Sequence, residues 1–242
     1  MYNDLMTDED LRTAAIAFVK KNKNTIARKL TDASIYKPDG APVSVFMAGS
    51  PGAGKTEFSK ALLLLLEKDK DHRMLRIDSD DFRTLIPGYT GENSHIFQGA
   101  VSIIAEKVQD YALANKQTFI FDGTFSKHDK AVDNIKRSLD KGRRVFIFYV
   151  YQKPSVAWKF TQAREKAEGR RIPKSAFIEQ FLGARETIER IGKEFGAAVS
   201  IVLVKKDFEK NSVEDIVNIN DGRPIDASIT ERYTRDELER SL

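Results

Sequence analysis

The chain has 242 residues, 41% hydrophobic and 31% charged, a balance that supports a folded core and excludes wholesale disorder. Its net charge of +4 and pI of about 9.0 suit anionic ligands, but the lysines and arginines are spread too evenly to indicate a nucleic-acid partner. The absence of cysteine excludes disulfides, and an acidic start with no apolar run longer than Ala61–Leu66 predicts a cytoplasmic protein without a membrane segment.

Residues 1–42 are predicted to form an N-terminal helical extension. Thr7 is a helix-capping residue followed by acids, and an amphipathic segment runs from it over Asp8–Leu30. The stretch "YKPDGAP", Tyr36–Pro42, then predicts a loop.

Residues 43–205 are predicted to form the main domain, in which strands alternate with helices. Five short apolar runs predict strands at Val43–Ala48, Met74–Ile77, Thr118–Phe121, Val145–Val150 and Val199–Val204. Helices are predicted at Thr56–Lys68, Glu92–Asn115, Lys127–Lys141, Pro154–Glu168 and Lys174–Phe195. This alternation indicates a three-layer α/β sandwich with a parallel five-stranded sheet covered by helices on both faces.

Residues 206–242 are predicted to extend the same domain. The stretch "VNINDGRPID" is typical of a small hairpin turning at Asp221-Gly222, and "YTRDELERSL" predicts a short terminal helix. No internal repeat or low-complexity linker divides the chain.

The stretch "GSPGAGKT" matches the phosphate-binding motif G-x-x-x-x-G-K-[ST] in full. It follows a predicted strand and precedes a predicted helix, which is the context that a P-loop requires. Glycines let the backbone N–H groups turn inward, and the helix N-terminus adds positive charge. We therefore predict a P-loop NTPase fold and an ATP site at Gly49, Ser50, Pro51, Gly52, Ala53, Gly54, Lys55, Thr56 and Glu57, with Lys55 on the β/γ-phosphates and Thr56 on Mg²⁺.

Acidic residues follow the second predicted strand in "RIDSDDF". Asp78 and Asp80 lie at its carboxyl end, the edge at which parallel sheets bind ligands. A carboxylate there can take the proton of an attacking hydroxyl or help to hold Mg²⁺. The alternative is a cluster that caps the following helical turn.

The third predicted strand ends in "TFIFDGT". Asp122 is placed to bind Mg²⁺ or its water, and Thr124 offers a hydroxyl to a substrate. The alternative is a simple strand-ending turn capped by Ser126.

Arginines in "TQAREKAEGRRIPKSAF" are candidates to stabilise charge on a transferred phosphoryl group. Arg164 lies in a predicted helix, and Arg170 and Arg171 lie at a break marked by glycine and proline. The alternative is a solvated helix face followed by a basic turn.

Taken together, "FMAGSPGAGKT", "IDSDDFR", "DGT" and "AREKAEGRRIP" resemble the zeta-toxin family of P-loop kinases in order and spacing, over about Val43 to Phe195. The resemblance implies an adenylate-kinase-like fold and phosphorylation of the 3′-hydroxyl of UDP-N-acetylglucosamine. It also implies a toxin that an antitoxin protein restrains.

By the same resemblance, Lys55 binds phosphate, Thr56 binds Mg²⁺, Asp78 is the base for the acceptor hydroxyl and Thr124 contacts the acceptor. Arg164 with Arg170 or Arg171 would clamp the phosphates. Two departures fall on the acceptor side. Asp122 stands where the family often has Glu, and Ser126 lies near a position at which some members carry arginine. The acceptor therefore stays open between the UDP-sugar and another hydroxyl compound.

The sequence thus predicts phosphoryl transfer from ATP-Mg²⁺ to a small-molecule hydroxyl. A polynucleotide 5′-kinase is a weaker alternative, because aromatic residues are not interleaved with a basic stripe. A nucleotide-gated switch that hydrolyses ATP slowly is the alternative from another class of protein.

Overall fold

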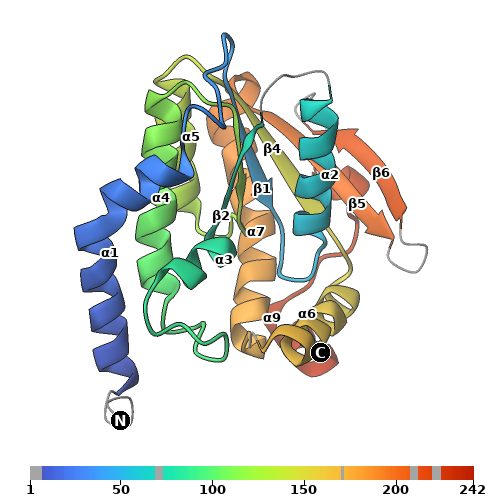
Figure 1. Ribbon diagram of the computed structural model, residues 1–242. Helices are drawn as coiled ribbons and strands as arrows, with labels where there is room; N and C mark the ends of the chain where they lie inside the picture. Colours follow the sequence, from blue (N-terminus) through green and yellow to red (C-terminus); the bar gives the residue numbers. More distant parts are fainter. Residues whose placement is uncertain (1–6, 69–72, 170–171, 208–211, 220–224) are drawn as a thin grey trace.

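The computed structural model describes residues 7–68, 73–169, 172–207, 212–219 and 225–242. Its centre is a six-stranded sheet in the order β2-β3-β1-β4-β5-β6 (Figure 1). Strands β1 to β5 are parallel, and β6 runs antiparallel to β5. The strands are β1 (Val43–Ala48), β2 (Leu75–Asp78), β3 (Phe119–Asp122), β4 (Arg144–Tyr151), β5 (Ser200–Asp207) and β6 (Ser212–Asn218).

The sixth strand corrects the prediction of a five-stranded sheet. Its sequence, SVEDIVN, has two acids and no continuous apolar run, so it lacks the signal of a buried strand. An edge strand of this kind pairs on one side only and tolerates charge. The hairpin predicted over "VNINDGRPID" is wrong, because Val217 and Asn218 pair with β5 and Ile225–Ser228 is helical. The turn expected at Asp221-Gly222 itself lies outside the described residues.

Helices cover both faces of the sheet, but unequally. On one face α4 (Gln98–Ala114), α5 (His128–Leu139) and α7 (Lys174–Phe195) build the larger hydrophobic core, and α1 (Asp8–Leu30) packs along α4. On the other face α2 (Lys55–Glu67) closes a smaller core. Alternation along β1 explains both cores, because its even-numbered and odd-numbered side chains enter different ones.

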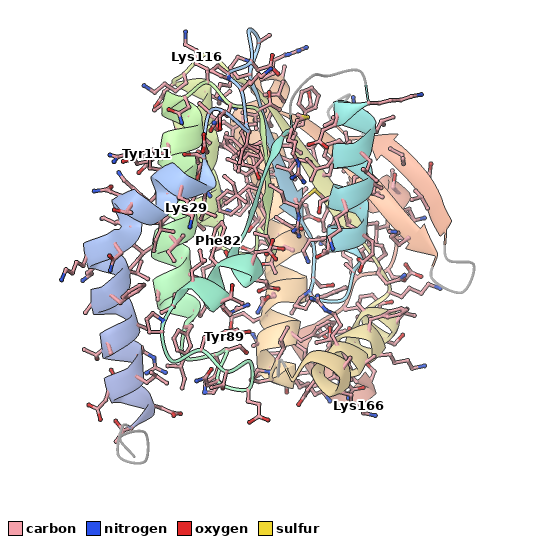
Figure 2. All side chains as sticks on the ribbon, viewed as in Figure 1. Lys29, Phe82, Tyr89, Tyr111, Lys116 and Lys166 are labelled. Carbon is pink, nitrogen blue, oxygen red and sulfur yellow. The ribbon has the colours of Figure 1, made fainter. Side chains whose placement is uncertain are left out.

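The segment between β2 and α4 is mostly loop rather than the predicted helical start at Glu92. Helix α3 (Ser79–Phe82) and the 3₁₀ turn η1 (Arg83–Leu85) follow β2 directly. Asn93 then holds the turn, accepting from the Thr90 N–H at 3.0 Å and donating to the Gly88 carbonyl at 2.9 Å. Buried Phe82 and the edge-on contact of Tyr89 with Phe97, at 5.7 Å between ring centroids, anchor this segment; Phe82 and Tyr89 are labelled in Figure 2.

The remaining helices lie after β4 and at the C-terminal end. They are α6 (Pro154–Glu168), the 3₁₀ turn η2 (Gly196–Ala198), α8 (Ile225–Ser228) and α9 (Arg235–Ser241). Arg185 of α7 fixes the C-terminal segment by pairing with Asp226 and donating to the Glu231 carbonyl at 2.7 Å. Of the helices that the structure describes, none combines the length and apolar character needed to cross a membrane.

Candidate active site

The P-loop forms as the sequence predicts, between β1 and α2. Gly49, Gly52 and Gly54 have positive φ angles of 137°, 69° and 87°. Gly54 is the N-cap of α2, so the helix N-terminus points into the loop. Glycine is the residue that adopts these angles without strain, which explains its spacing here.

The loop is also packed too tightly to admit side chains at two positions. A Cβ on Gly49 would lie 2.3 Å from the Val150 carbonyl oxygen, and one on Gly52 would lie 2.1 Å from that of Ala157. Gly52 therefore lets the P-loop pack directly against the first turn of α6. In addition, the Gly49 N–H donates to the Thr124 carbonyl at 3.0 Å, which joins the loop to the chain after β3.

Lys55 is folded back onto the P-loop. Its Nζ donates to the Ser50 carbonyl oxygen at 2.7 Å. Burial lowers the pKa of Lys55 to about 8; the neighbouring Asp122 opposes this shift, and Arg164 adds to it. An ammonium that donates to a P-loop carbonyl is placed to exchange that carbonyl for a phosphate oxygen.

Two carboxylates lie side by side at the edge of the sheet. Asp78 ends β2, Asp122 ends β3, and the parallel register pairs them directly. Both side chains are largely buried, at 12% and 5% exposure. Arg76, two residues before Asp78, reaches both through its Nη2 atom, which contacts Asp78 and lies 2.7 Å from Asp122 Oδ2.

Asp78 is a helix cap and also faces the candidate cavity, so the two interpretations of this residue are compatible. Its Oδ1 accepts from the Asp80 N–H at 2.8 Å, which caps α3. Burial raises the pKa of Asp78 to about 6; Arg76 opposes the shift, while Asp122 and Asp80 add to it. A carboxylate with this pKa is ionised at neutral pH and remains basic enough to accept a proton.

Asp122 has the chemistry of a Mg²⁺ ligand. Its Oδ2 accepts from the Ser59 hydroxyl at 2.9 Å and from Arg76, and none of the described residues donates to its Oδ1. Thr56 lines the same cavity as Asp122. A hydroxyl and a carboxylate oxygen beside the P-loop are hard ligands that fit Mg²⁺ brought with a nucleotide.

These groups line one cavity of about 800 Å³. Away from the P-loop its wall includes Asp80, which pairs with Arg83, and Gln98, which accepts from Arg83 at 2.9 Å. Thr124 and Ser126 share a hydrogen bond of 3.0 Å on the loop after β3. Predicted substrate ligands Asp80 and Thr124 thus lie in the same cavity as Lys55, and so do Thr56 and the exposed Glu57.

Of the three predicted arginines, Arg164 lines the cavity from α6 and lies close enough to Lys55 to influence its pKa. Arg170 and Arg171 lie outside the described residues. Ile172 and Pro173, which follow them, belong to the cavity wall.

A family model for zeta toxins matches residues 26–218, most of the chain. The chain belongs to the zeta-toxin family. With its P-loop and mostly parallel sheet it is a P-loop kinase, which confirms the resemblance and the α/β fold class predicted from sequence. Among curated protein sequences, none matches this zeta-toxin-family kinase.

Solved structures share the fold at low identity. A chain from the PezAT chromosomal toxin-antitoxin system of Streptococcus pneumoniae superposes with a TM-score of 0.64 at 16% identity, covering 94% of this chain and 91% of that one. A chain of the AvrRxo1-ORF1:-ORF2 complex with ATP gives 0.56 at 14% identity, covering 87% and 66%. A chain of the Pnkp1/Rnl/Hen1 RNA repair complex gives 0.50 at 20% identity, covering 64% and 47%.

Three features of this zeta-toxin-family site escaped prediction from sequence. Arg76 contacts both Asp78 and Asp122, and Ser59 donates to Asp122. Arg83 forms an ion pair with Asp80. Gly183 lets α7 approach the loop after β3, because a Cβ there would lie 2.7 Å from the Ser126 carbonyl oxygen. Only Arg76 carried a readable signal: it stands two residues before Asp78, on the same face of a strand.

Proposed function

We propose that this zeta-toxin-family kinase transfers the γ-phosphate of ATP to a hydroxyl of a nucleotide-sugar, with the 3′-hydroxyl of UDP-N-acetylglucosamine as the first candidate. One observation carries the proposal. Lys55 and Thr56 of the P-loop, Asp78 and Asp122 of the strand ends and Arg164 of α6 all line a single cavity. Asp78 supplies this cavity with a carboxylate that can accept the proton of a bound hydroxyl.

In this mechanism Lys55 and Arg164 would hold the phosphates, and Thr56 and Asp122 would hold Mg²⁺, which when bound would offset phosphate charge. Asp78 orients the acceptor hydroxyl and takes its proton. The hydroxyl oxygen then bonds to the γ-phosphorus, the bond from that phosphorus to the β–γ bridging oxygen breaks, and ADP leaves. Positioning and electrostatics carry such a reaction, since the protein forms no covalent bond to substrate.

The proposed biological role is that of a toxin restrained by an antitoxin protein. Membership of the zeta-toxin family supports it. Two structural neighbours belong to the PezAT toxin-antitoxin system and to the AvrRxo1-ORF1:-ORF2 complex. Copurification of a small partner encoded beside this chain would test the antitoxin, and growth arrest on expression would test toxicity.

The test of the reaction is a phosphoryl-transfer screen. Protein, ATP and Mg²⁺ are incubated with UDP-N-acetylglucosamine, other UDP-sugars, nucleosides and short oligonucleotides. Mass spectrometry of the products then detects the addition of one phosphate. Lys55→Ala and Asp78→Asn are the inactive controls. Labelling of UDP-N-acetylglucosamine supports the full proposal. Labelling of a different acceptor alone supports kinase activity but refutes UDP-N-acetylglucosamine as the substrate. Labelling of no acceptor refutes the proposal.

A further inference from the structure

Arg76 occupies an unusual position behind the two site carboxylates. Its Nη2 contacts the Oδ2 atoms of both Asp78 and Asp122, its Nε donates to the Ser59 hydroxyl at 3.3 Å, and its Nη1 lies 3.1 Å from Asp81. The side chain is 12% exposed and is not part of the cavity wall. The guanidinium is thus enclosed by one hydroxyl and three carboxylates from β2, β3, α2 and α3.

The geometry of the sheet explains why a cation is needed here. Parallel strands lie about 4.8 Å apart, so the register that pairs Asp78 with Asp122 brings two buried negative charges together. Side-by-side carboxylates of this kind also form a ready chelate for a hard divalent cation. Without a resident positive charge, the two residues would offer a divalent cation a bridging site next to the nucleotide cavity.

We propose that Arg76 is a positioning residue that fills the place between Asp78 and Asp122 and so prevents a divalent cation from bridging them. Asp122 Oδ1 is then left for the cation that accompanies the nucleotide, and Asp78 is left for the acceptor hydroxyl. These two tasks rest on the proposed function, whereas the blocking of the carboxylate pair follows from the contacts of Arg76 alone.

The decisive experiment measures Mn²⁺ binding to the nucleotide-free protein by the loss of the free-ion electron paramagnetic resonance signal. Arg76→Met should bind Mn²⁺ at least tenfold more tightly than the wild type, because a neutral side chain leaves the two carboxylates open. Arg76→Lys should give a smaller gain, since an ammonium keeps a positive charge beside the two carboxylates but lacks the Nε and Nη1 contacts to Ser59 and Asp81. Adding Asp122→Asn to Arg76→Met should abolish the gained site.

Arg185→Met is the matched control. Arg185 is 13% exposed and also binds two carboxylates, Glu189 and Asp226, but it lies away from the cavity. It should lower the melting temperature and leave Mn²⁺ affinity unchanged. Equal Mn²⁺ affinity in the wild type and Arg76→Met, or in Arg76→Lys if Arg76→Met does not fold, overturns the proposal.

An activity measurement separates this proposal from the proposed function. Arg76→Met should have a lower kcat and should be inhibited by excess Mg²⁺ at concentrations that leave the wild type unaffected. If the wild type labels no acceptor, the proposed reaction fails, while Mn²⁺ binding still decides whether Arg76 blocks the carboxylate pair.

Discussion

The two halves of the cavity are built differently. The donor half, to which the proposed function assigns ATP, is the P-loop Gly49–Thr56 with Arg164. It is made mostly of backbone, shaped by glycines and fixed against β4 and α6. The acceptor half, which we define as Asp78–Gln98 with Thr124–Ser126, is made of side chains that brace one another, such as Arg83 with Asp80 and Gln98. Backbone cradles suit the phosphates common to all nucleotides, whereas side chains can vary with the acceptor.

This difference predicts that substitutions in the two halves will change different kinetic parameters. A change in the donor half should reduce both ATP affinity and turnover. A change in the acceptor half should spare ATP affinity and act on kcat or on the KM of the acceptor. A variant whose effects crossed this division would show that the halves act as one unit.

Lys55→Ala should have the largest effect. It removes the ammonium that would hold the transferred phosphate, so kcat/KM should fall at least about a hundredfold and ATP binding should weaken strongly. Steady-state kinetics and calorimetry would measure the two losses. Unchanged ATP affinity would contradict a phosphate-binding role for Lys55.

Asp78→Asn should reduce turnover as severely as Lys55→Ala but should leave ATP binding largely intact. Losing a general base lowers kcat by about 10²–10⁴-fold, while the ATP dissociation constant should stay within about threefold because Asp78 belongs to the acceptor half. Wild-type turnover in this variant would rule out Asp78 as the base.

Gly52→Ala tests the packing of the donor half. The new methyl would meet the Ala157 carbonyl, and we expect a destabilisation of about 1–3 kcal/mol with at least a tenfold loss of ATP affinity. Gly142→Ala is the matched control, since Gly142 has a similar φ of +66° and no atom within 4 Å of an added Cβ. It should cost about 1 kcal/mol of strain without affecting ATP. Equal effects of the two variants on ATP affinity would refute the role of close packing.

Gly183→Ala is the counterpart in the acceptor half. Its methyl would press on the Ser126 carbonyl and should raise the KM of the acceptor several-fold with ATP affinity unchanged. Gly192→Ala in the same helix meets only Ile201, at 3.6 Å, and should stabilise α7 by about 0.5–1 kcal/mol. A rise in acceptor KM in both variants would point to α7 as a whole rather than to Gly183.

The pH dependence of kcat/KM tests Asp78 without a substitution. Asp78 acts as a base only when ionised, and burial raises its pKa to about 6, so kcat/KM should be constant at neutral pH and fall about tenfold per pH unit below 6. Initial rates between pH 5 and 8 would show this. A profile that is flat to pH 5 would mean that the base has an ordinary carboxylate pKa.

The contrast between the halves also explains what could be read from the sequence. The P-loop was predictable because its backbone requires glycine at fixed positions and a Lys-Thr pair follows directly. Asp78 and Asp122 were predictable because they end apolar strands. The contacts of Arg83 with Gln98 and of Gly183 with Ser126 form only in the tertiary fold. Local sequence patterns therefore do not predict them.

The prediction of secondary structure also failed where an element is only partly buried, because its sequence pattern is then weak. The other five strands were predictable from short, mostly apolar runs, whereas β6 pairs at an exposed edge and carries acids. The helix expected from Glu92 begins at Gln98, because Asn93 stabilises a turn that competes with helix formation.

The most direct test of the proposed phosphoryl transfer is whether ADP formation depends on an acceptor. Purified protein with ATP and Mg²⁺ should release ADP slowly alone and much faster with the acceptor found in the screen, with one phosphate added per ADP. Asp78→Asn should remove only the acceptor-dependent rate. ADP release that is equal with and without every acceptor, and unchanged by Asp78→Asn, would contradict phosphoryl transfer and favour a nucleotide-gated switch.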